Sequence, residues 1–315
     1  MTLGPELPHN PLCIGGVHRL LNYVYLAKPR SVLLLVVAAL ASFVACNPHA
    51  VALPVLVATL AGGAMASGGA NALNSYLDRD LDARMGRTSR RPLPLGLVTP
   101  RRALSFGLAL SALSILLLAG GANLLSAALA GAGIIYYVVV YTMWLKRRTS
   151  WNVVVGGLAG VMPVLVGGAA ATGGLSWLAI ALAVIVFLWT PVHFWSLALL
   201  RRDEYAHSGI PVLPVVAGAE ATRQQVLGYA IGTVLLSAVV AIAGMADWLY
   251  AAVAIVAGCG LLGAVGALAT RRTDRAAWVT YKLSSWYLAC VLSGVALDRL
   301  GLGSALITIL AGTAP

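Results

Sequence analysis

Three oxygen-bearing side chains, spaced four residues apart, are the group in this sequence best suited to chemistry: Asn74, Asp78 and Asp82. An α-helix turns about 100° per residue, so steps of four place them on one stripe of a helix. Asp80 points away from that stripe and is expected to pair with Arg84. Two carboxylates this close repel each other unless a cation lies between them. Carboxylate and amide oxygens suit Mg²⁺, which keeps waters and bridges to phosphate. The spacing therefore predicts a divalent-cation site.

Cationic residues follow this stripe closely, and a second acidic pair occurs later in the chain. Arginines are dense between positions 79 and 102, where Arg87 is one of them, and the second pair is Asp203 and Glu204. A guanidinium matches two phosphate oxygens at once, so a phosphate-bearing ligand is favoured. The alternative is a solvated loop with charges of both signs. The regular spacing and the second acidic pair favour the binding site.

Long apolar runs must position these side chains. Each is expected to be a helix, because unpaired backbone cannot face lipid. The nine predicted spans cover residues 31–46, 51–73, 103–119, 123–144, 153–171, 175–199, 226–244, 248–269 and 278–297. The first is short for a membrane span and would be lengthened by Tyr23–Ala27, and the last contains Lys282. Eight and ten spans are therefore alternatives to nine.

Composition, like the apolar runs, predicts an all-α polytopic membrane helical bundle. Hydrophobic residues make up 60% of the 315 positions and charged residues only 10%. Such a chain cannot be a cytosolic enzyme, a disordered protein or a secreted disulfide scaffold, because a soluble exterior needs more charge. We expect one membrane domain over residues 21–299, between a polar tail (1–20) and an apolar tail (300–315).

Positive charges are expected to set the topology. Lys and Arg number 21 against 10 Asp and Glu, a net charge of +11. They gather in alternate loops, which places the N-terminus in the cytoplasm and explains the charge without a nucleic-acid partner. The lipid bilayer is the partner that the apolar spans and the charged loops require. With no transit peptide visible, the inner (plasma) membrane of a bacterial cell is expected rather than the mitochondrial inner membrane.

Several stretches together resemble the UbiA superfamily of intramembrane prenyltransferases. The Asn74-x-x-x-Asp78-x-x-x-Asp82 run resembles its first signature, and NSYLDRDLDARMGRTSRRPLPLG is most similar to its protohaem farnesyltransferase (haem O synthase) branch. Further similar stretches are LAKPR (Leu26–Arg30), Tyr141–Gly167 and Pro191–Val216. Quinone-pathway relatives carry a second D-x-x-x-D after span six. Here that position reads Asp203-Glu204-Tyr205-Ala206-His207, which favours the haem branch.

The resemblance implies transfer of a farnesyl group from farnesyl diphosphate to a vinyl group of protohaem (haem B), with addition of water, giving haem O. It implies that Asp78 and Asp82 hold Mg²⁺ with Asn74 assisting, and that Asp203 and Glu204, also counted as catalytic, hold a second ion. Diphosphate binding is expected from Arg87, Lys146 and Arg147, with Tyr205 as a weaker candidate. Haem A synthase or a terminal oxidase is a possible recipient of the product.

Other functions stay open at this point. A UbiA-type enzyme with an aromatic, quinone-precursor acceptor is the alternative within the class. Outside the enzyme class, the alternative is a transporter. A transporter would more often place its ionisable groups near mid-membrane, whereas the carboxylates here gather at one membrane edge. His193 is the one such residue singled out, because a polar group in a span is a functional candidate. It could bind haem iron, contact a propionate or move a proton, or it could simply bond to a neighbouring helix.

Overall fold

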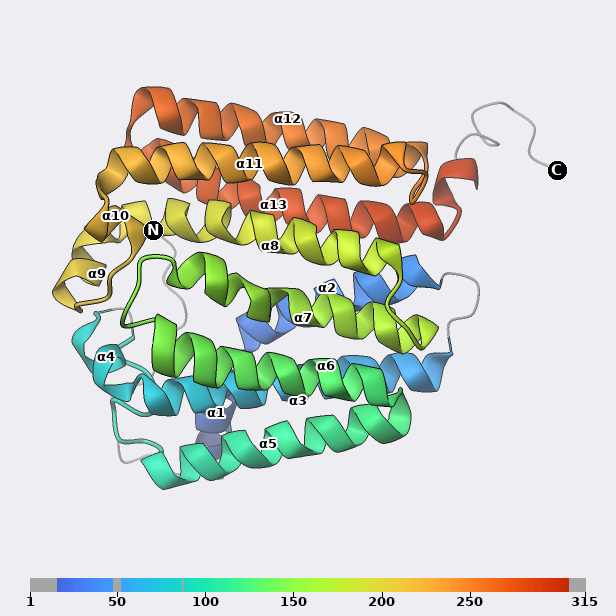
Figure 1. Cartoon of the computed structure of the whole chain (residues 1–315). Coiled ribbons are helices and arrows are strands. Elements are labelled where there is room, and N and C mark those ends of the chain that lie inside the picture. Colours follow the sequence, from blue (N-terminus) through green and yellow to red (C-terminus); the bar gives the residue numbers. More distant parts are fainter. Residues whose placement is uncertain (1–15, 48–51, 87, 306–315) are drawn as a thin grey trace.

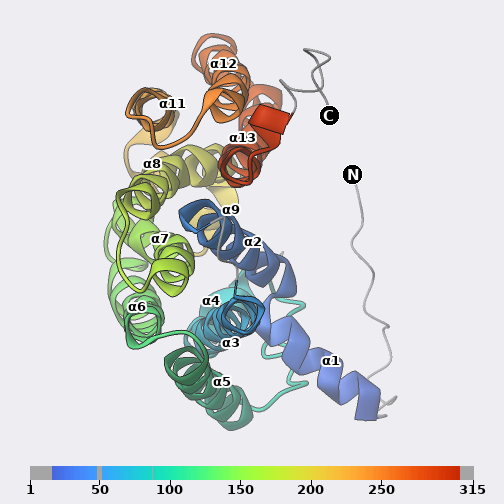
Figure 2. The ribbon, with the colours of Figure 1, turned by 90° about the vertical axis from the view of Figure 1, so that its right-hand side faces the viewer.

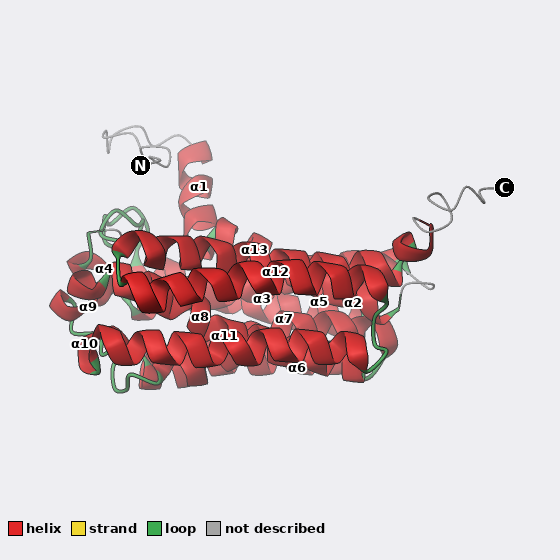
Figure 3. Cartoon of the chain, turned by 90° about the horizontal axis from the view of Figure 1, so that it is seen from above, coloured by secondary structure: helices red, strands yellow, loops and turns green. Residues whose placement is uncertain are grey.

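The computed structural model describes residues 16–47, 52–86 and 88–305. Over these residues the chain forms thirteen α-helices and one π-helix, and no strand (Figure 3). The expected all-α class is therefore confirmed. Arg87, one predicted diphosphate ligand, lies outside the described residues, as do most of the two predicted tails.

Eight helical segments are long and apolar enough to cross a membrane. They are α2 (Pro29–Cys46), α3 (Leu53–Leu77), α5 (Pro100–Gly121), α6 (Leu124–Ile135) with the π-helix η1 (Tyr136–Leu145), α7 (Asn152–Thr172), α8 (Trp177–Leu200), α11 (Gly218–Ile242) and α12 (Trp248–Arg271). The ninth expected span coincides with α13 (Asp274–Arg299), which is long but more polar and is not among the eight. A count of nine spans and a cytoplasmic N-terminus remain predictions.

The long helices form a ring when the bundle is viewed end-on (Figure 2). Following the chain from α2, each helix packs on the next through α3, α5, α6, α7, α8, α11, α12 and α13, and α13 returns to α2. Helix α2 also packs against α7. Four short helices complete the fold: α1 (Gly16–Ala27), α4 (Arg79–Arg84), α9 (Arg202–His207) and α10 (Leu213–Val216). Figure 1 shows α4, α9 and α10 gathered at one end of the bundle.

Small residues let the helices approach closely where they cross. At Gly167 of α7, an added Cβ would lie 2.1 Å from the carbonyl oxygen of Ala39 in α2, so no larger residue fits. Gly69 of α3 meets Ser111 of α5 in the same way. Without a hydrophobic force between helices in lipid, such close contact is what holds them together.

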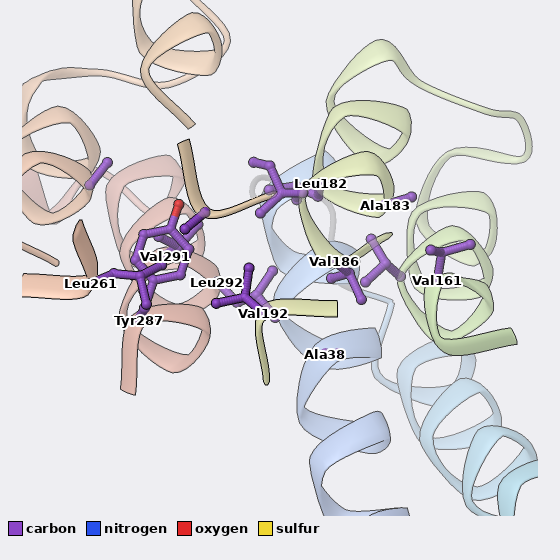
Figure 4. Packing of buried hydrophobic residues seen from close by; sticks show 14 of the residues in the cluster. Ala38, Val161, Leu182, Ala183, Val186, Val192, Leu261, Tyr287, Val291 and Leu292 are labelled. Carbon is purple, nitrogen blue, oxygen red and sulfur yellow. The ribbon is translucent and has the colours of Figure 1, made fainter. Parts of the chain in front are cut away.

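Apolar side chains fill the interior of the bundle. Figure 4 shows Ala38 of α2, Val161 of α7, Val186 of α8 and Leu292 of α13 in one cluster. The outer surface is also apolar, and Ile242 is an example with 84% of its surface exposed. A soluble protein rarely leaves so much apolar surface in water, so this surface is suited to lipid.

Helix α1 does not extend the first span. Lys28 adopts a left-handed conformation (φ 57°, ψ 67°) between α1 and α2, and Pro29 begins α2. The chain therefore turns at Lys28, and α1 projects from the bundle (Figure 3). The expectation that Tyr23–Ala27 lengthens the span is wrong, because a continuous helix cannot pass through a left-handed residue.

A buried carboxylate joins α13 to α12 at the opposite end from α4 and α9. Asp298 is 3% exposed and accepts hydrogen bonds from the backbone N–H groups of Asp247 and Tyr250. These N–H groups lie at the start of α12, where no carbonyl within the helix can reach them. Asp298 therefore serves as a cap for α12 supplied by another helix.

Candidate functional site

The predicted stripe of oxygen-bearing side chains runs across the junction of α3 and α4. Asp78 (φ −91°, ψ 7°) separates the two helices, yet the i→i+4 hydrogen bonds continue through it. The N–H of Asp78 donates to the Asn74 carbonyl (2.9 Å), and the N–H of Asp82 donates to the Asp78 carbonyl (2.8 Å). All three side chains are buried, with 4%, 1% and 4% of Asn74, Asp78 and Asp82 exposed. The expected shared face is therefore present despite the break.

Asn74 connects this stripe to two other parts of the chain. Its amide nitrogen donates to Asp78 Oδ2 (2.8 Å) and to Thr142 Oγ1 in η1 (3.0 Å). Its amide oxygen accepts from Lys28 Nζ (2.6 Å). A buried amide with all these partners has a fixed orientation. Asn74 therefore holds Lys28 and Asp78 in place.

Each carboxylate of the stripe has its own cation. Lys146 Nζ donates to Asp78 Oδ2, and Arg91 Nη1 donates to both Asp82 oxygens (2.9 and 2.8 Å). This arrangement removes the repulsion that the spacing alone would create. The other oxygen of Asp78, Oδ1, is buried and accepts no hydrogen bond.

Asp80 pairs with Arg147 rather than with the expected Arg84. Two Arg147 nitrogens donate to its carboxylate oxygens (2.8 and 2.7 Å), and these bonds lower the pKa of Asp80 to about 2. The prediction was wrong because it considered only α4, whereas the loop after η1 brings Arg147 alongside. Arg147 also lies 3.8 Å from Asp78 Oδ1, so it is near the stripe but already bound to a carboxylate.

A cavity of about 150 Å³ opens onto the stripe. Among the described residues that line it, three are cationic (Lys28, Arg91 and Lys146) and one is acidic (Asp82). Burial, followed by the neighbouring Arg91 guanidinium, lowers the pKa of Lys28 to about 7. A buried cation that is costly to keep charged gains most when an anion arrives. The cavity is therefore arranged to receive an anionic group.

Aromatic side chains form another wall of the cavity, namely Tyr137, Tyr141, Phe194 and Tyr205. The rings of Tyr137 and Tyr141 stack with their centroids 5.5 Å apart. Glycine at position 156 leaves room for this wall, since an added Cβ there would lie 2.3 Å from the Tyr141 ring. The cavity thus pairs a cationic side with an aromatic side.

A π-helix brings Lys146 to the cavity. Within η1, Thr142 Oγ1 donates to the Tyr137 carbonyl five residues earlier (2.8 Å), and the Lys146 N–H donates to the Tyr141 carbonyl (2.9 Å). Such wide turns are uncommon and often occur at functional sites. This one places Thr142 against Asn74 and Lys146 against Asp78.

The second acidic cluster lies on α9 and is only partly joined to the cavity. Tyr205 is buried and lines it, whereas Asp203 is exposed. Glu204 is partly exposed and lies 3.8 Å from Arg201. Asp203 and Glu204 line a separate, open surface hollow of about 600 Å³ beside Gly86. Contacts among Leu81, Met85, Tyr205, Ile210 and Val212 pack α9 and the loop after it against α4.

His193 lies on α8 but outside the cavity. Its ring is stacked on Trp189 and lies against Tyr281 of α13, with both centroids 4.6 Å away. Phe194, the next residue, does line the cavity. His193 is therefore beside the site rather than within it.

Part of the predicted metal site is suited to a divalent cation. In the parts of the chain that are described, no three His, Cys, Asp or Glu side chains come together as a complete metal site. Mg²⁺ does not need one, since it is often held by one or two carboxylates together with waters and substrate phosphates. The unbonded Oδ1 of Asp78 fits that description, whereas the Asn74 and Asp82 oxygens would reach a cation only in place of Lys28 and Arg91. Asp203 does not line the cavity.

Several residues of the site were not singled out from the sequence. They are the cavity residues Lys28, Arg91, Tyr137 and Tyr141, and also Thr142, which contacts Asn74. Lys28 lies in LAKPR, a stretch that does carry the family resemblance, so a signal existed. Arg91 is one arginine among many, and nothing in its spacing shows that the loop folds back to Asp82. The tyrosines lie in an apolar run that reads as an ordinary span.

Comparison with known proteins decides the family. Residues 34–286 match the UbiA prenyltransferase family. The chain belongs to this family. A relative from Symbiobacterium thermophilum, named protoheme IX farnesyltransferase, is 45% identical over 279 residues, covering 88% of this chain and 93% of that one. A protein of the same name from Roseiflexus is 41% identical over 295 residues, covering 94% of this chain and 55% of that one. Another from Thermus thermophilus is 45% identical over 278 residues, covering 88% of this chain and 46% of that one. The predicted resemblance is confirmed.

Solved structures of membrane proteins share the fold. A structure described as digeranylgeranylglyceryl phosphate synthase in membranes superposes with a TM-score of 0.77 at 15% identity, covering 90% of this chain and 99% of that one. A UbiA homologue from Archaeoglobus fulgidus bound to GPP and Mg²⁺ gives a TM-score of 0.66 at 20% identity, covering 87% and 99%. At these identities the similarity establishes the architecture of the bundle.

Proposed function

We propose that this enzyme transfers the farnesyl group of farnesyl diphosphate to a vinyl group of protohaem, with addition of water, to give haem O. The observation that carries the proposal is the cavity lined by Lys28, Arg91 and Lys146 beside a buried carboxylate stripe. This is a site for an anionic leaving group at the end of a membrane bundle. The acceptor comes from the relatives that are 41–45% identical and named protoheme IX farnesyltransferase.

The size of the cavity suits the diphosphate and not the prenyl chain. Its volume is about 150 Å³. The polar head of farnesyl diphosphate is accommodated there, beside Tyr137 and Tyr141, while the chain extends between apolar helices. Water is kept from the reacting carbon by the aromatic wall.

Asp78, Asp82 and Asn74 would hold Mg²⁺. The ion supplies charge to stabilise the diphosphate as it leaves. Lys28, Arg91 and Lys146 contribute further positive charge at fixed positions, which is effective because it needs no rearrangement during the reaction. Arg87 and Arg147 remain candidates for the outer side of the diphosphate, and Asp203 and Glu204 for a second cation at the neighbouring hollow.

No side-chain nucleophile is required for the transfer. The allylic C–O bond breaks and its electron pair leaves with the diphosphate. The vinyl group of haem then bonds to the farnesyl carbon. Water adds to the carbon left electron-poor and loses a proton, which gives the hydroxyethylfarnesyl group. The protein's task is to bind both substrates and exclude other water.

The test uses purified protein with protohaem, farnesyl diphosphate and Mg²⁺, and mass spectrometry of the haem products. We expect a haem species heavier by farnesyl plus water, absent without Mg²⁺ and absent in Asp78→Asn. The matched control is Asp247→Asn, an exposed acid at the other end of the bundle, which keeps full activity. Unmodified haem together with prenylation of a hydroxybenzoate would show that the acceptor is wrong.

The protein is a multi-pass membrane protein by its eight apolar helices. Its bacterial relatives support a place in the plasma membrane. Transfer of the product to haem A synthase or a terminal oxidase remains a prediction.

A further inference from the structure

The aromatic and histidine cluster between α8 and α13 has no part in binding the diphosphate. It consists of Trp189 and His193 on α8 and of Tyr281, Ser284 and Ser285 on α13. The Trp189 indole N–H donates to the Ser284 carbonyl (2.7 Å), which fixes that ring against α13. The His193 ring is then held between Trp189 and Tyr281, with interplanar angles of 23° and 34°.

The serine hydroxyls beside His193 favour one tautomer of its ring. Nδ1 lies 3.0 Å from Ser284 Oγ and 3.4 Å from Ser285 Oγ. Both hydroxyls also lie within donating distance of the Tyr281 carbonyl, at 2.8 and 3.3 Å. A hydroxyl that gives its one hydrogen to this carbonyl can only accept from the imidazole. This pattern favours the tautomer with the proton on Nδ1 and the lone pair on Nε2.

This is the arrangement of a histidine prepared to bind a metal. Ligand histidines usually donate the other ring N–H to a fixed acceptor, which sets the tautomer and the direction of the lone pair. Ser284 is fully buried, His193 is half-buried and Ser285 is exposed, so the cluster extends from the core to the surface of the bundle.

We infer that His193 Nε2 is an axial ligand of the iron of the porphyrin acceptor, an inference that rests on the proposed function. Among the described residues no carboxylate or thiolate cluster accompanies it as a free-ion site would need, so an iron already held by four porphyrin nitrogens is the ligand that one imidazole suits. The Trp189 and Tyr281 rings lie at small angles to the imidazole, so they would meet the macrocycle with their edges.

A cation and the cavity wall lie on either side of this ligand. Lys282 is exposed on α13, with its Nζ 5.9 Å from the centre of the Tyr281 ring, where it can pair with a haem propionate. On α8, Phe194 follows His193 directly and lines the diphosphate cavity. Iron bound at His193 would thus keep the macrocycle next to the farnesyl diphosphate site without occupying it.

The test is the visible spectrum of ferric protohaem titrated into purified protein. Wild type is expected to show a histidine-ligated spectrum. In His193→Ala that spectrum is lost, haem affinity falls by about tenfold or more, and added imidazole restores the spectrum. Ser284→Ala keeps the imidazole but removes the nearer acceptor, and should weaken haem binding by about tenfold. The matched control is His207→Ala on α9, an exposed histidine, which leaves the spectrum unchanged.

Metal-free protoporphyrin separates iron ligation from a structural role. It has no iron, so wild type and His193→Ala should bind it equally. Two results overturn the inference. One is an unchanged haem spectrum in His193→Ala, and the other is a loss of metal-free porphyrin binding in that variant equal to its loss of haem binding. If the wild type still farnesylates haem in those cases, the proposed function stands. If the wild type binds no haem at all, both fall.

Discussion

The buried ion pair of Asp78 and Lys146 can be removed one partner at a time, and the cost of each removal follows from its surroundings. The Asp78 side chain is 2% exposed and that of Lys146 is 19% exposed. Asp78→Ala leaves the ammonium without its counter-charge. Breaking a buried pair costs about 3–5 kcal/mol. Because water partly reaches Lys146, we expect the lower value, about 3 kcal/mol.

Lys146→Met should cost a similar amount, about 3 kcal/mol, because it leaves the Asp78 carboxylate with only the Asn74 amide as a hydrogen-bond donor. The double variant removes both charges and is expected to cost only about 2 kcal/mol, since no unpaired charge remains. The coupling between the two positions is then about 4 kcal/mol.

The assay is chemical unfolding of each variant in detergent micelles, followed by tryptophan fluorescence, together with the farnesyl-transfer assay. Stability should largely return in the double variant, whereas turnover should be absent from all three, because Asp78 is a proposed Mg²⁺ ligand and Lys146 a proposed diphosphate ligand. Costs that simply add would refute the charge argument. A double variant that regains turnover would refute the metal role of Asp78.

Three further predictions concern the cavity and the packing of the bundle. Lys28→Met removes a charged hydrogen-bond donor worth about 1.5–3 kcal/mol, so KM for farnesyl diphosphate should rise tenfold or more while KM for haem is unchanged; equal effects on both would contradict this. Asp298→Ala removes the cap of α12 and should lower the unfolding free energy by about 1–2 kcal/mol without altering KM. A changed KM would contradict a purely structural role for Asp298. Gly167→Ala, which drives a Cβ into the Ala39 carbonyl, should cost at least 1–3 kcal/mol, whereas Gly63→Ala meets nothing within 4 Å and should be tolerated.

The helices were predictable because membrane length and hydrophobicity leave few alternatives. All nine predicted spans coincide with helices, and the span expected at 153–171, for example, is helix Asn152–Thr172. The shared face of Asn74, Asp78 and Asp82 was predictable for a similar reason, since it depends only on the four-residue spacing along one helical segment. A break in the helix at Asp78 did not disturb it.

Contacts between distant segments were less predictable. Asp80 was assigned to Arg84 by helical spacing, but a stronger, bidentate partner comes from Arg147, 67 residues later. Arg91 reaches Asp82 because the loop after α4 folds back, with Thr88 bonded to the Asp82 carbonyl (3.0 Å). Spacing along one helix contains no information about such loops. His193 was singled out as a polar residue within a span, although its neighbours on α13 could not be foreseen.

The π-helix η1 has a consequence for reading related sequences. Within it, residues five apart are joined, as Lys146 is to Tyr141, whereas in an ordinary helix the partner of Lys146 would be Thr142. A relative lacking one residue in this segment could form a regular α-helix and still bring the same lysine to the same carboxylate. Alignments of this span should therefore permit a one-residue gap. Without that gap, each residue on one side of the wide turn would be aligned with the wrong residue of the relative. The tyrosines of the aromatic wall would then seem to be substituted even where the relative keeps them.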